Sequence, residues 1–202
     1  MFKYRKYSWQ DGKQLELKDR TLIMGILNGT PDSFSEGGRY NTSETAVTHA
    51  KQMIEQGADI LDVGVESTRP GHTQISIAEE IERMKDILLP VLDVASVPVS
   101  VDTYRAETAD FALSHGAHIL NDIWGLKYDK DMAAVAAKYD VPVIIMHNQN
   151  STDYDDIIDD MKAFFFSSVD LALKEGVKPQ NIWLDPGIGF GKDYAQNVEV
   201  IQ

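Results

Sequence analysis

The chain has 202 residues, 43% of them hydrophobic, and no cysteine, which allows one sizeable core in one or two domains and excludes disulfides and thiolate chemistry. Its formal net charge of −13 argues against nucleic acid or an anionic membrane surface as a partner, although a local cluster of Lys or Arg would still accept an anionic substrate. Because no apolar stretch approaches the roughly 20 residues of a membrane span and residues 1–19 lack the apolar core of a signal peptide, we expect a cytoplasmic protein.

Residues 1–20 are polar and aromatic without a helical period, which predicts a short N-terminal hairpin or cap. From residue 21 onward, short apolar runs alternate with amphipathic segments. The runs predict strands near residues 22–27, 60–63, 97–101, 118–120, 141–146 and 182–184. The segments between them predict helices near residues 43–56, 76–94, 105–114, 130–139 and 155–175. This alternation is typical of repeated βαβ units, and no linker divides it.

Repeated βαβ units form either an open doubly wound sheet or a closed (β/α)8 barrel. A doubly wound sheet concentrates its site at one switch point, whereas every strand end of a barrel faces one common mouth. Polar residues occur at or near the ends of all six predicted strands: Asn28, Asp62, Asp102, Asn121, His147 and Asp185. We therefore predict an α/β fold of the TIM-barrel type over residues 21–202. A complete barrel takes about 250 residues and eight units. Only about six βα units are present here, so we expect the barrel to be truncated before its seventh strand.

The segment Met24–Gly38 carries the densest chemistry of the chain. It begins as an apolar run and ends in a loop with an amide, two carboxylates, three hydroxyls, an aromatic ring and a Gly pair. Parallel α/β folds build their sites in this way, at the carboxyl edge of the sheet. We therefore expect the functional site to lie in this loop.

Two other polar loops follow predicted strands, and each has two interpretations. Glu66–Gly71 contains Arg69, which either clamps a phosphate or carboxylate or is a solvated side chain beside a Pro-Gly turn. In Asp185–Lys192, three glycines let the backbone approach a flat ligand, and Asp185 can accept two hydrogen bonds from it. The alternative is an ordinary Gly-rich turn in which Asp185 caps the next helix.

Single strand-end residues are weaker signals. Asp102 and Asn121 each place an acceptor where a helix N-cap is more common than a ligand contact. Of the five histidines, His147 is at a strand tip. No His, Asp or Glu cluster has the spacing of a zinc site, and no G-x-G-x-x-G or Walker loop supports a nucleotide cofactor.

Together these segments resemble the dihydropteroate synthase family, pterin-binding TIM-barrel enzymes of the folate pathway that sulfonamides inhibit. The similarity runs from about Thr21 to the end of the chain. It rests on three long motifs in the family's order, Gly25–Gly38, Asp59–Gly71 and Ile182–Lys192.

The resemblance implies that 6-hydroxymethyl-7,8-dihydropterin diphosphate condenses with p-aminobenzoate to give 7,8-dihydropteroate and pyrophosphate. It implies Mg²⁺ as cofactor, small-molecule substrates as partners and a homodimer at full length. The implied pterin-binding residues are Asp102, Asn121, Ile123, Met146 and Asp185. The implied p-aminobenzoate-binding residues are Phe34, Ser35, Pro70 and Phe190. Diphosphate binding falls to Thr68 and Arg69, metal binding to Asn28, and catalytic roles to Asp32, Ser35, Glu36 and Arg69.

The chain departs from the family pattern at several positions. Gly29 replaces a bulky aliphatic residue, which we expect to loosen the first loop, and Val65 replaces a glycine, which is strained if its φ is positive. Glu36 replaces Asp, and Asp193 replaces Thr. The family's Ser-Arg-Lys-like motif and its later Arg and His are not found.

Two alternatives therefore stay open. One is an inactive truncated remnant of such an enzyme. The other is the methyltetrahydrofolate-binding barrel of a corrinoid methyltransferase, which lacks the Thr30–Ser35 loop. The activity of this chain alone, its sulfonamide sensitivity and its oligomeric state are open as well.

Overall fold

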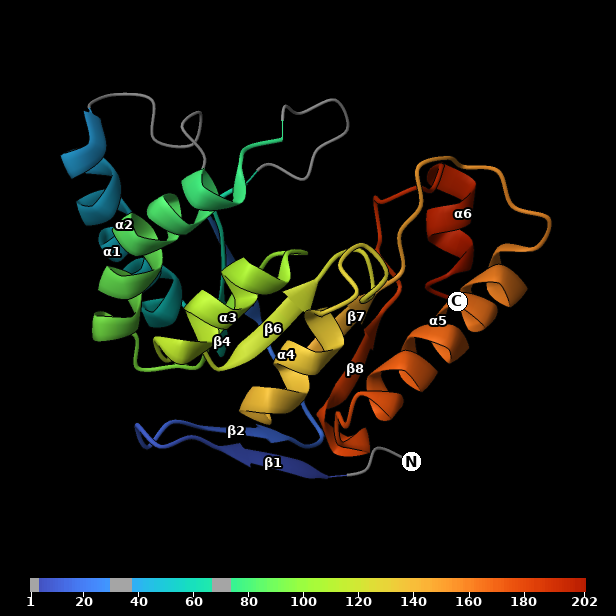
Figure 1. Cartoon of the computed structure of the whole chain (residues 1–202), viewed down its shortest axis with the longest axis horizontal. Coiled ribbons are helices and arrows are strands. Elements are labelled where there is room, and N and C mark those ends of the chain that lie inside the picture. The colour runs from blue at the N-terminus through green and yellow to red at the C-terminus, as the bar shows by residue number, and fades with distance from the viewer. Residues whose placement is uncertain (1–3, 30–37, 67–73) are drawn as a thin grey trace. The chain divides into compact units, whose positions relative to one another are not determined.

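The computed structural model describes residues 4–29, 38–66 and 74–202, except for the side chains of residues 38–42. The first elements are β1 (Arg5–Ser8), β2 (Gln14–Leu17), β3 (Met24–Asn28), α1 (Gly38–Glu55), β4 (Ile60–Gly64), α2 (Ile77–Val94) and β5 (Val99–Asp102) (Figure 1). They are followed by α3 (Ala106–Ser114), β6 (Ile119–Asp122), α4 (Met132–Tyr139), β7 (Val143–Met146), α5 (Ile157–Lys174), a 3₁₀ helix (Pro179–Asn181), β8 (Ile182–Asp185) and α6 (Tyr194–Glu199). Within the described ranges, no helix combines the length and apolar character that crossing a membrane requires.

The six predicted strands and the five predicted helices between them are present. The six strands form one parallel sheet in chain order, β3-β4-β5-β6-β7-β8, so the prediction of sequential parallel strands is confirmed and a doubly wound order is excluded. Four of the six strands begin one or two residues later than predicted, and two of these, β5 and β7, begin two residues later, directly after Pro98 and Pro142. A proline has no N–H to give to a neighbouring strand, which explains the later start of β5 and β7.

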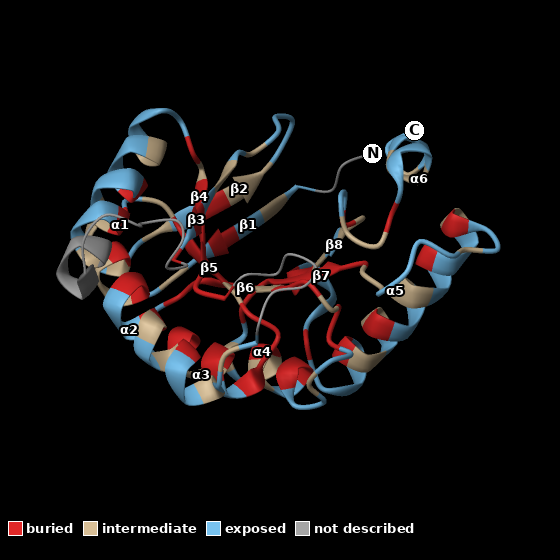
Figure 2. Cartoon of the chain, turned by 90° about the horizontal axis from the view of Figure 1, so that it is seen from above, coloured by how far each residue is buried: buried red, intermediate tan, exposed pale blue. Residues whose placement is uncertain are grey.

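The chain divides into two compact units, residues 1–103 with 107–119 and residues 104–106 with 120–202. In the first unit, β4 pairs with β3 on one side and β5 on the other, and all five of its residues are buried (Figure 2). Leu27, Leu61, Met84 and Leu88 are also inaccessible to solvent. A strand buried along its whole length is typical of a parallel sheet covered on both faces.

Residues 5–17 form an antiparallel hairpin that is tied to the rest of the first unit. At its turn, the Asp11 carboxylate accepts a hydrogen bond from His118 Nε2 at 2.9 Å. His118 Nδ1 in turn accepts one from the Val99 backbone N–H at 3.0 Å, so the ring is neutral with its proton on Nε2. Just after the hairpin, Arg20 forms an ion pair with Asp59. The hairpin is therefore fixed at both of its ends.

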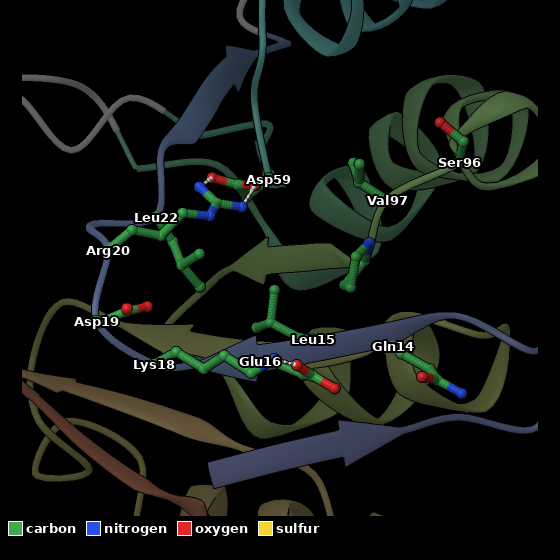
Figure 3. Close-up of a pocket in the computed structure, with 11 residues that line it drawn as sticks. Gln14, Leu15, Glu16, Lys18, Asp19, Arg20, Leu22, Asp59, Ser96 and Val97 are labelled. Atoms are coloured by element: carbon green, nitrogen blue, oxygen red, sulfur yellow. Dashed lines mark hydrogen bonds and ion pairs between the residues drawn. The ribbon is translucent and has the colours of Figure 1, made fainter. Parts of the chain in front are cut away.

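A cavity of about 310 Å³ lies beside this hairpin (Figure 3). Leu22, Asp59 and Pro98 line it, and each comes just before one of the strands β3, β4 and β5. The cavity is therefore at the amino ends of these strands. Sites in parallel α/β folds form at the opposite, carboxyl ends, so we do not assign the substrate site to this cavity.

In the second unit, β7 pairs with β6 and β8, and its four residues are buried. Helix α5 contacts both α4 and β8. Asp156 starts α5 by accepting hydrogen bonds from the N–H groups of Ile158 and Asp159, as an N-cap does. The helix thereby covers one side of the strands whose ends carry the candidate site.

A buried carboxylate joins α2 to the turn that follows β5. Glu80 is 2% exposed, and its two oxygens accept hydrogen bonds from the hydroxyls of Thr103 at 2.7 Å and Thr108 at 2.9 Å. Thr103 comes directly after Asp102, and Thr108 lies on α3. Glu80 therefore fixes the backbone beside a predicted site residue.

We predict that Glu80→Ala lowers the free energy of unfolding by about 2–4 kcal/mol, because two buried hydroxyls lose their acceptors and a cavity opens. Urea denaturation measures the effect. Glu82→Ala on the same helix is the control, since that carboxylate is exposed and paired with Lys85, and it should cost less than about 1 kcal/mol. Equal losses in the two variants would contradict the structural role of Glu80.

Candidate active site

Two predicted site residues stand at the carboxyl ends of strands in the first unit. Asn28 is the last residue of β3, and Asp102 is the last residue of β5. The parallel register pairs Asn28 with Gly64 and Gly64 with Asp102, so both side chains project from one face of the sheet. Asn28 is exposed and Asp102 is half-buried. An amide and a carboxylate are thus presented from neighbouring positions on that face.

Other predicted residues lie outside the described ranges, and their roles stay predictions. They are Asp32, Phe34, Ser35, Glu36, Thr68, Arg69 and Pro70.

The second unit places an amide, a thioether and a carboxylate on one face. Asn121 pairs with Ile144 in the register of β6 and β7, and Met146, two residues further on, pairs with Asp185 of β8. Because alternate residues of a strand share a face, Asn121, Met146 and Asp185 all project from the same side at the carboxyl ends. The structure thus brings three predicted pterin-binding residues to one edge of this unit.

An apolar cluster adjoins this edge. Tyr104, Ile123 and Met146 are buried against one another, and Trp124 and Phe190 pack on them. Ile123 and Met146 are the two predicted pterin walls, and Phe190 is predicted to contact p-aminobenzoate. The cluster therefore provides an apolar surface beside the polar ends of β6, β7 and β8.

The turn after β6 is held by a buried carboxylate. Asp122 is inaccessible to solvent and accepts hydrogen bonds from the N–H groups of Trp124 and Leu126, both at 2.8 Å. Burial raises the pKa of Asp122 to about 6. Leu126 has a φ of 67°, which is uncommon for a residue with a side chain. Asp122 thus stabilises a strained turn that positions Ile123 and Trp124 in the cluster.

The loop after β8 is fixed at its start. The backbone N–H of Gly187 donates to Asp185 Oδ1 at 2.8 Å. Gly187 has a φ of +68°, and a Cβ there would lie 2.1 Å from the His147 carbonyl oxygen, so only glycine fits. The residue that caps α6 is Asp193, which forms a capping box with Gln196. The alternative in which Asp185 caps the next helix is therefore wrong, and Asp185 presents its carboxylate at the strand end.

Two departures from the family pattern have structural explanations. Gly29 is buried, and a Cβ at this position would lie 2.2 Å from Ile87 Cδ1. Ile87 thus takes up the space into which a larger residue 29 would project. The expectation that Gly29 loosens the first loop stays a prediction, because that loop lies outside the described residues. Val65 is buried, and the described non-glycine residues with positive φ are Leu126 and Asp140. Val65 is therefore not strained.

His147 is enclosed by aromatic rings. It is 2% exposed and lies edge-on to Phe164 with ring centroids 4.9 Å apart. Burial, followed by the charges of Lys192 and Lys127, lowers its pKa to about 4. His147 is therefore neutral at physiological pH and serves to pack β7 against α5.

The described residues contain no group of three or more His, Asp or Glu side chains that could hold a metal ion. The predicted metal ligand, Asn28, offers one exposed amide oxygen at the end of β3. Mg²⁺ bound through substrate phosphates usually takes only one or two protein ligands and keeps several waters. A single amide fits this type of site.

A family model described as "Pterin binding enzyme" matches residues 24–202. The chain belongs to the pterin-binding enzymes. It is 51% identical over 189 residues to the dihydropteroate synthase of Clostridium beijerinckii, an alignment that covers 94% of this chain and 70% of that protein. It is 49% identical over 187 residues to the dihydropteroate synthase of Bacillus subtilis, covering 93% of this chain and 66% of that protein. The resemblance inferred from the motifs is confirmed.

Solved structures of pterin-binding enzymes share this fold. Dihydropteroate synthase from Clostridium difficile, in the presence of pteroic acid, superposes with a TM-score of 0.87 at 52% identity, over 90% of this chain and 70% of that one. The Xanthomonas albilineans enzyme with 4-aminobenzoic acid gives 0.88 at 38% identity, over 95% of this chain and 70% of that one. The predicted TIM-barrel family is thereby confirmed.

Three residues that support this site were not predicted from the sequence. Tyr104 follows a strand end by two residues, and as an aromatic it gave a signal that could have been used. Asp122 accepts from backbone N–H groups of the turn after β6, and the sequence does not reveal the geometry of that turn. Lys192 was not among the predicted site residues, although it is buried.

We predict that Asp122 makes unfolding of this pterin-binding unit depend on pH. Its folded-state pKa of about 6 lies above the ordinary value of 3.8, so the folded state binds this proton more tightly. The carboxyl therefore favours folding fully below about pH 4, and this contribution is lost as pH rises to about 6, a change on the order of 3 kcal/mol.

Urea denaturation of the parent and of Asp122→Asn between pH 4 and 7.5 measures this contribution as the difference between the two curves. The difference should fall with rising pH up to about 6 and then stay level. A difference that is constant with pH would show that Asp122 titrates as an ordinary carboxyl.

Proposed function

We propose that this protein is a transferase of folate biosynthesis that condenses 6-hydroxymethyl-7,8-dihydropterin diphosphate with p-aminobenzoate, giving 7,8-dihydropteroate and pyrophosphate. The observation that carries the proposal is the shared sheet face of Asn121, Met146 and Asp185, beside the apolar cluster around Ile123. Relatives bind ligands of this chemistry: the Anaplasma phagocytophilum enzyme holds 6-hydroxymethylpterin-monophosphate, and a Yersinia pestis structure is a complex with a sulfonamide drug.

Pterin recognition requires flat apolar walls and a polar edge. Met146 and Ile123 supply apolar surface. The Asn121 amide can both donate and accept, and the Asp185 carboxylate accepts from the N–H groups of the pterin edge. Asp185 Oδ1 is already held by the Gly187 N–H, which fixes the plane of the carboxylate. Asp102, at the end of β5 in the first unit, stays a predicted pterin-binding residue.

The p-aminobenzoate ring is proposed to lie against Phe190, which packs on the Tyr104–Ile123–Met146 cluster. Phe34 and Pro70 are proposed as the other walls, with Ser35 near the carboxylate of the ring. An apolar slot of this kind keeps water from the methylene carbon, where the leaving of pyrophosphate develops positive charge. The nucleophilic amine is then the favoured acceptor of the pterinylmethyl group.

The diphosphate needs neutralising charge as it leaves. Thr68 and Arg69 are proposed to contact it. Asp32 and Glu36 are proposed as catalytic residues, together with Ser35 and Arg69. Asn28 would hold Mg²⁺, which when bound supplies positive charge to the diphosphate oxygens. A homodimer and a cytoplasmic location stay predictions from the sequence and the family.

We predict that Asp185→Asn lowers the affinity for pteroic acid by on the order of 100-fold. The new amide oxygen can still accept from Gly187, which turns its NH₂ group toward the donor edge of the pterin and leaves buried donors facing one another. Isothermal titration calorimetry measures the affinity. Asp159→Asn, an exposed position on α5, is the control and should bind like the parent. Unchanged affinity of the Asp185 variant would overturn the pterin assignment.

A further inference from the structure

Lys192 ends the Gly-rich loop that follows β8, and its ammonium group is enclosed by the protein. The residue is 8% exposed. Its Nζ donates to the backbone carbonyl oxygens of Phe190 at 2.9 Å and Gly187 at 3.0 Å, with a longer contact of 3.4 Å to that of His147. An ammonium has three N–H donors, and here three carbonyl oxygens are placed as their acceptors.

These three carbonyls belong to the parts of the backbone that carry the candidate site. His147 directly follows Met146, and its N–H donates to the Asp185 carbonyl at 2.9 Å. The Gly187 N–H orients the Asp185 carboxylate, and the Phe190 ring lies on the apolar cluster. One side chain thus joins the end of β7 to both the start and the tip of the loop.

We propose that Lys192 is a positioning residue of the substrate site, which holds Asp185 and Phe190 in their binding geometry through its bonds to the loop carbonyls. This rests on the proposed function of those two residues. A lysine near a diphosphate site has another obvious role, that of a phosphate-binding cation. The geometry does not favour that role, because the donors of Nζ are directed at backbone oxygens.

The chemistry of the pocket suits lysine better than arginine. Burial lowers the pKa of Lys192 to about 8, and the negative charge of Asp185 opposes this shift. A compact ammonium can donate in three directions from the end of a flexible stem, whereas the fork of an arginine is planar and larger. Other bonds also hold the loop nearby, from Tyr154 Oη to the Gly191 carbonyl at 2.7 Å and from the Gly189 N–H to Asn197 Oδ1 at 2.7 Å. A turn bond from the Phe190 N–H to the Gly187 carbonyl at 3.1 Å joins these two residues to each other but does not tie them to β7, as Lys192 does.

The first measurement needs no ligand. Hydrogen exchange of the parent chain, followed by mass spectrometry, should show amides of residues 187–191 protected well above the level of the exposed chain end. Lys192→Met keeps the stem and removes the donors, and exchange in this segment should rise while exchange in β7 changes little. A parent loop that exchanges as fast as the chain end would overturn the proposal.

The second measurement is calorimetry with pteroic acid, which has no phosphate group. A positioning role predicts that Lys192→Met weakens this affinity at least about tenfold, since hydrogen bonds from a charged group are among the stronger ones. A phosphate-binding role predicts no change. Lys162→Met, at an exposed lysine paired with Asp159, removes the same charge and should bind like the parent. If Lys192→Met does not fold, Lys192→Gln, which keeps an amide donor, serves in its place.

Chemical rescue provides the final control. Because the chain has no cysteine, Lys192→Cys introduces a single thiol. Alkylating it with 2-bromoethylamine in denaturant, followed by refolding, rebuilds a side chain of lysine length with a terminal ammonium, and should restore the affinity for pteroic acid. Binding by the parent with no loss in the variants overturns the positioning role and leaves the proposed function intact. A parent that does not bind pteroic acid overturns the proposed function itself.

Discussion

Parallel strands in register turn the same positions toward the same face, and this constraint places the strand-end residues of the candidate site. Met146 and Asp185 are register partners at the ends of β7 and β8, and Asn121 shares their face two residues earlier. In the first unit, Asn28 and Asp102 meet the same condition through Gly64. A shift of one residue in any of these pairings would turn a polar strand end away from the site. The set of side chains that face the site at the carboxyl edge thus depends on the backbone hydrogen bonds along the strands.

Strand ends must also be held, and here the chain uses buried charges. Glu80 binds the hydroxyls beside Asp102, Asp122 binds the N–H groups of the turn that carries Ile123, and Lys192 binds carbonyls around Asp185. A buried charge is tolerated only where hydrogen bonds replace its hydration. Each of these groups therefore constrains the backbone that satisfies it, since a displaced backbone would leave the charge without partners.

Much of the fold could be predicted from the sequence, because the apolar runs and amphipathic segments have distinct periods and the strands end in polar residues. The gathering of Met146, Ile123 and Phe190 was implied by the family motifs. Other features depend on backbone geometry that composition does not encode. Leu126 adopts a positive φ without being glycine, so the turn around Asp122 could not be anticipated. Asp193 rather than Asp185 caps α6, and either residue satisfies the pattern of an N-cap. The fit of Gly29 against Ile87 joins positions far apart in the chain, which a local pattern cannot show.

The hydrogen bonds that hold the turn after β6 and the loop after β8 affect ligand affinity as well as backbone geometry. A ligand that has to order a loop loses part of its binding free energy to that ordering, whereas a loop already held in place adds little cost. The Asp122 turn and the Lys192 loop are both closed by bonds that need no ligand. If Asp185 binds the pterin edge as proposed, discrimination at that edge would follow from rigidity, because a carboxylate held in place cannot move to accommodate an acceptor in place of a donor. Under that proposal, selectivity at this edge would depend on residues that do not touch the ligand as much as on those that do.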